Sequence, residues 1–205
     1  GGDDGLYEDR KFQQNIQGAL ANGIQVGVYF YSGASNAREA YDEASYCISL
    51  IRDYQITYPV AFDWELDGDY DSVTEACETF CNVISSYGYQ PMVYSNRNRW
   101  YNNFDGEKIA SKYKVWMAAY FGKFYYDSVR WTYGDDLPNF RYHYDMWQYS
   151  SRCYVDGISG QVDVDIAFFG YANYHVDTKD AVLTVTNKEI KRTYGDGIGR
   201  LTEEL

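Results

Sequence analysis

The chain is short of several residue types on which large classes of protein depend. It contains two histidines, His143 and His175, so a His-centred catalytic triad or a His-rich metal site has little material. No apolar run approaches the roughly 20 residues that a membrane-spanning helix needs. Basic residues are outnumbered, with 18 Lys and Arg against 30 Asp and Glu and a net charge of −12. This acidic balance argues against nucleic acid as a partner, because phosphates demand a basic surface.

Cysteine is also scarce. The four cysteines are Cys47, Cys77, Cys81 and Cys153, an even number that is compatible with zero to two disulfides. A chain of 205 residues can bury a sizeable core without such crosslinks. Cys77 and Cys81 share one predicted helix face, but a metal site there needs further Cys or His ligands. Plain thiols are the favoured interpretation, and at least one disulfide is the alternative.

Neither an initiator methionine nor a charged-then-apolar leader opens the chain. Its first residues, GGDD, are typical of a loop interior, so we expect a processed or truncated start. Aromatic residues, in contrast, are abundant, with 24 Tyr, 10 Phe and 5 Trp. Aromatics on this scale suit a packed barrel and also flat platforms for sugar rings.

Apolar and β-branched runs of strand length recur along the chain. Helical patterns separate the early runs, and Gly23 and Gly88 stand where helices are expected to end. Strand alternating with helix predicts right-handed units around a parallel sheet. The predicted strands cover 25–32, 58–65, 90–97, 113–120, 144–151 and 160–169, and the predicted helices cover 8–22, 36–54, 71–87 and 98–111.

The last part of the chain departs from this alternation. Residues 121–143 are aromatic and loop-like, and the link between the last two strands is shorter than the dozen or so residues of a parallel crossover. These two strands should therefore form an antiparallel hairpin. We predict an α/β fold within residues 1–175, a modified (β/α) TIM-like barrel whose last strands lack helices. Residues 176–205 are expected to form a C-terminal tail or a linker into another module, with one strand-like piece at 181–186.

Two carboxylates share one face of the second predicted strand. In the run AFDWE, Asp63 and Glu65 point one way and the aromatics between them point the other, because side chains alternate along a strand. Both acids lie at the carboxyl end, where barrel enzymes place their chemistry. Glycosidases use two such carboxylates as general acid and charge stabiliser, which predicts Glu65 as the acid and Asp63 as its partner. The alternative is a strand that runs out into a solvated acidic loop.

A second acid pair, Asp163 and Asp165, shares a face of the last predicted strand. If this strand runs antiparallel, its start lies at the catalytic rim, so Asp163 is the better candidate for the site. Asp165 is expected to face down the barrel or to make a structural hydrogen bond. The alternative for Asp163 is a loop-capping carboxylate, since Asp readily bonds local backbone.

Aromatic and polar residues end the other predicted strands. Aromatic faces with a few hydrogen-bonding tips suit a sugar cleft, and barrel packing is the alternative for each residue. The candidates for substrate contact are Tyr31, Tyr94, Tyr120 and Trp147.

Taken in order, these motifs resemble glycoside hydrolase family 25, the lysozymes also called N-acetylmuramidases. The chitinase-like family 18 is a rival, and its members carry the motif DxxDxDxE on a comparable strand. When the motif's glutamate is aligned on Glu65, the motif requires Asp at the positions of Tyr58, Ala61 and Asp63. Only Asp63 matches, so the resemblance to family 18 is weak. The stretches similar to family 25 run from about residue 5 to residue 169 and are GLYED, GIQVGVYFYS, PVAFDWE, MVYSNRNRW, VWMAAY and MWQYSSRCYVDGISGQVDVDIAF.

The resemblance implies cleavage of the β-1,4 bond between N-acetylmuramic acid and N-acetylglucosamine in peptidoglycan. It implies Glu65 as the acid, Asp63 as its companion and Asp163 as the acid of the last strand, with Tyr94, Tyr120 and Trp147 lining the cleft. It further implies no metal or organic cofactor, peptidoglycan glycan strands as the partner, and a secreted, cell-wall-associated location, with recognition by the cleft or by an additional wall-binding module. A non-catalytic peptidoglycan-binding barrel is the alternative function.

Two departures from the family pattern affect these expectations. Family members begin with a strand that carries another active-site Asp, and this chain starts beyond that strand. We therefore expect a barrel that is incomplete at its N-terminus and a polypeptide that is catalytically impaired unless complemented. The family's N-W-W stretch is also altered, because Asn98-Arg99-Trp100 keeps only one Trp.

Overall fold

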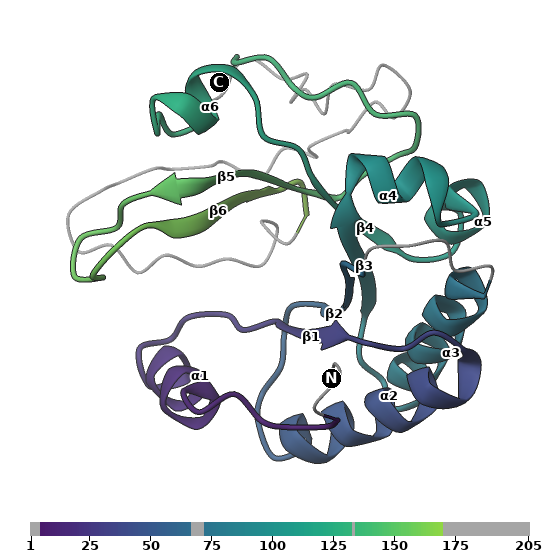
Figure 1. The fold of residues 1–205 in the computed structure, drawn as a ribbon. Coiled ribbons are helices and arrows are strands. Elements are labelled where there is room, and N and C mark those ends of the chain that lie inside the picture. Colours follow the sequence, from purple (N-terminus) through teal and green to yellow (C-terminus); the bar gives the residue numbers. More distant parts are fainter. Residues whose placement is uncertain (1–4, 67–71, 133, 170–205) are drawn as a thin grey trace, which may run out of the picture.

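The computed structural model describes residues 5–66, 72–132 and 134–169. Six strands form one sheet in the same order as in the sequence. The first four neighbouring pairs are parallel and the last pair is antiparallel. The sheet curls into a half-barrel (Figure 1). The strands are β1 (Val28–Ser32), β2 (Val60–Trp64), β3 (Pro91–Asn96), β4 (Lys114–Ala118), β5 (Met146–Cys153) and β6 (Val162–Ala167).

Helices connect the parallel strands and cover the outer face of the curled sheet (Figure 1). Local sequence sets their ends: the Asn36 side chain accepts a hydrogen bond from the Glu39 backbone N–H and so caps α2. Gly23 and Gly88 adopt positive φ just after α1 and α3, as the sequence predicts. The helices are α1 (Phe12–Ala21), α2 (Ala37–Ile51), α3 (Val73–Ser86), α4 (Arg97–Asn102), α5 (Gly106–Ala110) and α6 (Gly122–Tyr126).

The main hydrophobic core lies between the sheet and these helices. Phe62 and Trp64 of β2 are fully buried there, against Phe80 of α3 and Phe104 respectively. This confirms that the two aromatics of the AFDWE run face the helices. Because neighbouring side chains alternate along a strand, Asp63 must face the concave side of the half-barrel.

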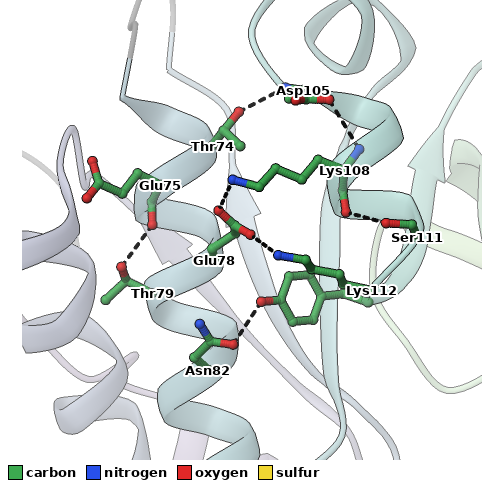
Figure 2. Close-up of polar contacts among 10 residues, drawn as sticks. Thr74, Glu75, Glu78, Thr79, Asn82, Asp105, Lys108, Ser111 and Lys112 are labelled. Atoms are coloured by element: carbon green, nitrogen blue, oxygen red, sulfur yellow. Dashed lines mark hydrogen bonds and ion pairs between the residues drawn. The ribbon is translucent and has the colours of Figure 1, made fainter.

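An ion-pair cluster joins α3 to α5 on the outside of the core (Figure 2). The Glu78 carboxylate lies 2.6 Å from the Lys108 ammonium and 2.5 Å from that of Lys112. Close by, the Thr74 hydroxyl accepts a hydrogen bond from the Asp105 backbone N–H. The cluster fixes the short helix α5 onto the longer α3.

The structure confirms the predicted order of elements with shifts at their ends. Five predicted strands each contain one observed strand, whereas β5 begins inside the predicted 144–151 and extends two residues beyond it, and β5 and β6 form the expected antiparallel hairpin. The weak fourth helical pattern divides into α4 and α5, and the stretch expected to be loop contains the short α6. The predicted strand-like piece at 181–186 and the predicted tail at 176–205 lie outside the described residues.

All four cysteines are buried free thiols. Burial raises the pKa of Cys47 to about 12, so this thiol stays protonated at neutral pH. No helix in the described part of the chain is long and apolar enough to cross a membrane.

Candidate active site

The concave face carries one row of aligned polar and aromatic residues across four strands. Tyr31 of β1 stands beside Asp63 of β2, which stands beside Tyr94 of β3, and Trp116 of β4 follows. Residues in register on neighbouring parallel strands share a face, so the four side chains line one wall. The row lies near the carboxyl ends of the strands, where the sequence placed the chemistry.

Asp63 is the most buried acid of this wall. It is 7% exposed, and its Oδ1 atom has no hydrogen-bond partner in the described part of the chain. Burial raises the pKa of Asp63 to about 8, the charge of Glu65 adds to the rise, and the Arg99 guanidinium opposes it. Asp63 is therefore a carboxyl group that holds its proton at neutral pH.

Glu65 follows directly after β2 and is half-buried. The backbone that carries it is held from the neighbouring strand and helix. Arg99 of α4 donates to the backbone carbonyls of Glu65 and Leu66, and Ser95 of β3 donates to that of Trp64. The end of β2 is thus fixed at three consecutive carbonyls.

Two phenols meet at one amide beside these acids. The hydroxyls of Tyr94 and Tyr120 both donate to the Oε1 atom of Gln148 in β5, the former at 2.8 Å. Burial, followed by neighbouring negative charge, raises the pKa of Tyr94 far above its usual value and that of Tyr120 to about 12. Both phenols are therefore neutral hydrogen-bond donors at physiological pH.

The antiparallel β6 brings two further acids to the same region. Asp165 accepts a hydrogen bond from the Trp116 indole at 2.7 Å, as its predicted structural role requires. Burial raises the pKa of Asp165 to about 7, with the Trp116 bond opposing the rise and Asp163 adding to it. Asp163 is exposed, and its negative charge raises the pKa of Tyr120, to which Glu65 also contributes. The structure therefore brings Glu65, which follows β2, and the two acids of β6 near the Tyr120 phenol.

The predicted aromatic contacts fall into two groups. Tyr31 and Tyr120 are each 40% exposed, and Tyr94 is buried against Trp116. Trp147 differs from the expectation: its side chain has no exposed surface and stacks on Phe121 with ring centroids 5.5 Å apart. Trp147 lies on the face opposite to Gln148, so it belongs to the packing under the hairpin and is not available to a ligand.

A groove of about 690 Å³ runs between α1, β1 and α2. Tyr29 and Tyr31 of β1 line it, together with apolar residues such as Phe12 and Ile16. Burial, followed by the charges of Asp63, Asp9 and Asp163, raises the pKa of Tyr29. The groove therefore shares Tyr31 with the wall that carries Asp63.

Sequence reasoning did not assign roles to Gln148, Trp116 or Arg99. Alternation along their strands placed Trp116 and Gln148 on a face, but their partners come from other strands. In the described residues, no group of three or more His, Cys, Asp or Glu side chains is arranged to hold a metal ion. The site thus consists of carboxyls, phenols and amides.

Comparison of the chain with known proteins points to one family. The model described as Glycosyl hydrolases family 25 matches residues 3–158 of the chain. The Autolytic lysozyme of Clostridium acetobutylicum is 26% identical over 164 residues, which cover 78% of this chain and 44% of the relative. The Lysozyme of Streptococcus phage Cp-1 is 29% identical over 137 residues, covering 62% and 37% of the two chains.

Solved structures agree with this match. The modular autolysin LytC from Streptococcus pneumoniae has a TM-score of 0.61 and 28% identity, over 78% of this chain and 37% of that protein. LytC has also been solved in complex with a synthetic peptidoglycan ligand. The present chain spans less than half the length of each of these three relatives.

Proposed function

The chain belongs to glycosyl hydrolases family 25, and from that premise we propose that it is a peptidoglycan hydrolase of the lysozyme type. The bond cleaved is the β-1,4 linkage between N-acetylmuramic acid and N-acetylglucosamine. One observation supports this most strongly: acids from β2 and β6 gather around the hydrogen-bonded Tyr94, Gln148 and Tyr120. Glycoside hydrolases use carboxyl groups of this kind to cleave the glycosidic bond.

In the proposed reaction, Glu65 is the general acid. It donates its proton to the glycosidic oxygen while the bond from that oxygen to the sugar C1 breaks. A water molecule then adds to C1 and returns a proton to the carboxylate, so the overall reaction is hydrolysis. Glu65 suits this role because it is half-buried at the open end of β2, whereas Asp63 lies deeper.

Asp63 and Asp163 are the supporting carboxylates of the proposal. Asp63 shares the wall with Glu65, and the charge of Glu65 adds to the burial that raises the pKa of Asp63. Asp163 is exposed near Tyr120, where a carboxylate can stabilise positive charge that develops at C1.

The proposed substrate contacts are Tyr31, Tyr94 and Tyr120. Tyr31 and Tyr120 offer exposed rings on which a sugar can stack. Tyr94 is buried and supports Tyr120 through the shared bond to Gln148. Trp147 has no part in this proposal, because its ring is enclosed by the hairpin packing.

The proposal also includes location and context. Its substrate is the bacterial wall, so the chain is proposed to act outside the cell, as a secreted protein. A further wall-binding module is the proposed alternative to recognition by the cleft alone.

The test is mass spectrometry of the soluble products after incubation of purified peptidoglycan with the chain. We expect new reducing N-acetylmuramic acid ends, and we expect Glu65→Gln to reduce their rate of formation by about 100-fold or more. Glu107→Gln is the matched control, since Glu107 is exposed on α5. Its rate should equal that of the wild type.

Two other outcomes have distinct meanings. Equal product formation by the wild type and Glu65→Gln would remove Glu65 from the role of acid. No products from either protein, with both still sedimenting with the wall, would support the non-catalytic peptidoglycan-binding module or the catalytically impaired chain expected from the sequence. The same assay on an N-terminally extended protein would separate these two.

A further inference from the structure

We propose that Arg99 is a positioning residue that aims the Glu65 side chain by holding the backbone carbonyls of Glu65 and Leu66. The inference rests on the proposed function, because it assigns a role within that same site. Arg99 belongs to the stretch in which this chain departs from the family's N-W-W pattern. It is therefore a feature of this chain's own sequence.

The guanidinium group holds two consecutive carbonyls. Its Nε atom donates to the Leu66 carbonyl at 3.0 Å, and one terminal nitrogen donates to the Glu65 carbonyl at 2.6 Å. A planar guanidinium offers several N–H donors in a fixed fork, whereas a lysine offers only a point charge. The fork therefore fixes the two consecutive carbonyls that follow the Glu65 Cα.

Arg99 is itself anchored. Its backbone N–H donates to the Asn96 side chain at 3.0 Å, which caps the start of α4. Ser95, one residue earlier, donates its hydroxyl to the Trp64 carbonyl at 2.8 Å inside the core. The turn from β3 into α4 thus donates hydrogen bonds to the backbone carbonyls of residues 64, 65 and 66 at the end of β2.

The hydrogen bonds from Ser95 and Arg99 hold the backbone at the point where β2 stops pairing with its neighbouring strands. The β2–β3 pairing ends at Asp63 and Tyr94, and the β1–β2 pairing ends at Ser32 and Trp64, so Glu65 lies beyond the ladder on both sides. A general acid must hold its proton within hydrogen-bond reach of the leaving oxygen, and a misplacement of about 1 Å can cost roughly 100-fold in rate. The three side-chain contacts replace the missing ladder bonds at the residue that needs them most.

The charge of Arg99 acts on the same acids. Among the charged groups, Glu65 raises the pKa of Asp63 and Arg99 lowers it, while Tyr29, Tyr31 and Tyr94 face this acid as neutral phenols. Arg99 therefore has two separable effects, one through its fork and one through its charge. Arg99→Lys removes the fork and keeps the charge, whereas Arg99→Gln removes both.

The experiment compares Arg99→Lys and Arg99→Gln with the wild type on soluble peptidoglycan fragments. We expect Arg99→Gln to lower kcat by roughly 10- to 100-fold with KM changed by less than about threefold, because orientation and not binding is lost. Its pH–rate profile should move to higher pH. Arg99→Lys should keep the wild-type profile, because the charge remains, and still show a reduced kcat.

Arg52→Gln is the control for loss of one arginine. Arg52 follows the last residue of α2, at the opposite end of the strands, and its side chain is exposed. This variant should match the wild type in kcat, KM and pH profile. Melting temperatures of all variants would show whether each is folded at the assay temperature. If Arg99→Gln is unfolded there, the kcat of Arg99→Lys alone tests the proposal.

A second readout does not need turnover. Carboxyl ¹³C NMR titration of Asp63 should show its midpoint moving to higher pH in Arg99→Gln and staying in place in Arg99→Lys. Wild-type kcat and pH profile in both Arg99 variants would overturn the inference and leave the proposed function intact. An inactive wild-type chain would overturn both, even if the NMR midpoint moves.

Discussion

At the scale of single residues, the buried Asp63 carboxyl makes the stability of the fold depend on pH. A carboxyl whose pKa rises from its ordinary value to about 8 on folding favours the folded state only while it is protonated. Its contribution is fully present below the unfolded-state pKa of about 3.9 and is lost as the pH rises towards 8. We expect Asp63→Asn to raise the melting temperature by several degrees at pH 8 and to change it least near pH 4. Thermal unfolding across this range measures the difference.

The control for this experiment is Asp53→Asn. The Asp53 side chain is 86% exposed, so its removal should shift the melting temperature by similar small amounts at every pH. A Tm difference between Asp63→Asn and the wild type that grows towards low pH would contradict the sign of the argument.

The Gln148 amide supports a second prediction at this scale. Removing its oxygen in Gln148→Leu leaves the buried Tyr94 hydroxyl without its acceptor, which should lower the free energy of unfolding by about 1–3 kcal/mol. Tyr94→Phe removes the donor. If the bond is the common cause, the double variant should lose less stability than the sum of the single variants, and denaturant unfolding of the four proteins measures this. Strict additivity would show that the bond is not the cause.

The same residues show what a sequence can and cannot say about a site. Period-2 alternation places Asp63 and Glu65 on one wall because the period depends only on the strand itself. It does not say which face of β5 packs against neighbouring elements, and Trp147 and Tyr149, which share one face, both pack against Phe124. The role of Gln148 depends on Tyr94 and Tyr120 from two other chain segments, a juxtaposition that only the folded sheet creates.

At the scale of elements, the contact between α3 and α5 depends on charge (Figure 2). Partial burial tends to raise the pKa of Glu78, but the hydrogen bonds and charges of Lys108 and Lys112 outweigh it and leave that pKa lowered. The stabilisation is present above the unfolded-state pKa and is lost as the pH falls through the folded one. We expect Glu78→Gln to lower the melting temperature by a few degrees at pH 7 and by less at pH 3.

The ion pairs are partly exposed, so the effect should also shrink in high salt. Glu107→Gln on α5 is the control, and it should leave the melting temperature unchanged within a degree or so. An equal loss from Glu78→Gln at both pH values would mean that packing of the side chain, and not its charge, holds α5 in place.

Element positions were largely predictable, and element ends were not. Apolar runs and the glycines at 23 and 88 fix where strands and helices lie, because both signals are local. The division of the fourth helical pattern occurs at Asp105, whose side chain caps α5 and whose backbone N–H donates to Thr74 of α3. The second bond is tertiary, so no local pattern reports it.

At the scale of the whole molecule, the antiparallel hairpin determines how the site is assembled. A parallel last strand would point its carboxyl end to the rim, whereas the antiparallel β6 brings its first residues there. Asp163 reaches the site for that reason, and Asp165 lies one step deeper against Trp116. The sequence predicted this inversion from loop length alone, which is a property of chain geometry and does not depend on side-chain packing.

Net charge leads to the last prediction. The chain carries −12, so an anionic wall repels it at long range, and the screening length falls from about 30 Å at 0.01 M salt to about 8 Å at 0.15 M. We therefore expect binding to intact wall, measured by sedimentation, to increase with salt over this range. Binding to wall stripped of anionic polymers should change little.

Neutralising three exposed acids tests whether charge is the cause. The triple variant Asp42→Asn, Asp53→Asn, Glu107→Gln changes the net charge from −12 to −9 without touching the acid cluster. Because repulsion scales with the protein's charge, its binding should be tighter than that of the wild type at low salt and equal to it at high salt. Binding that instead falls steeply with added salt would mean that local basic residues contact the wall, and recognition would then depend on those residues more than on the cleft.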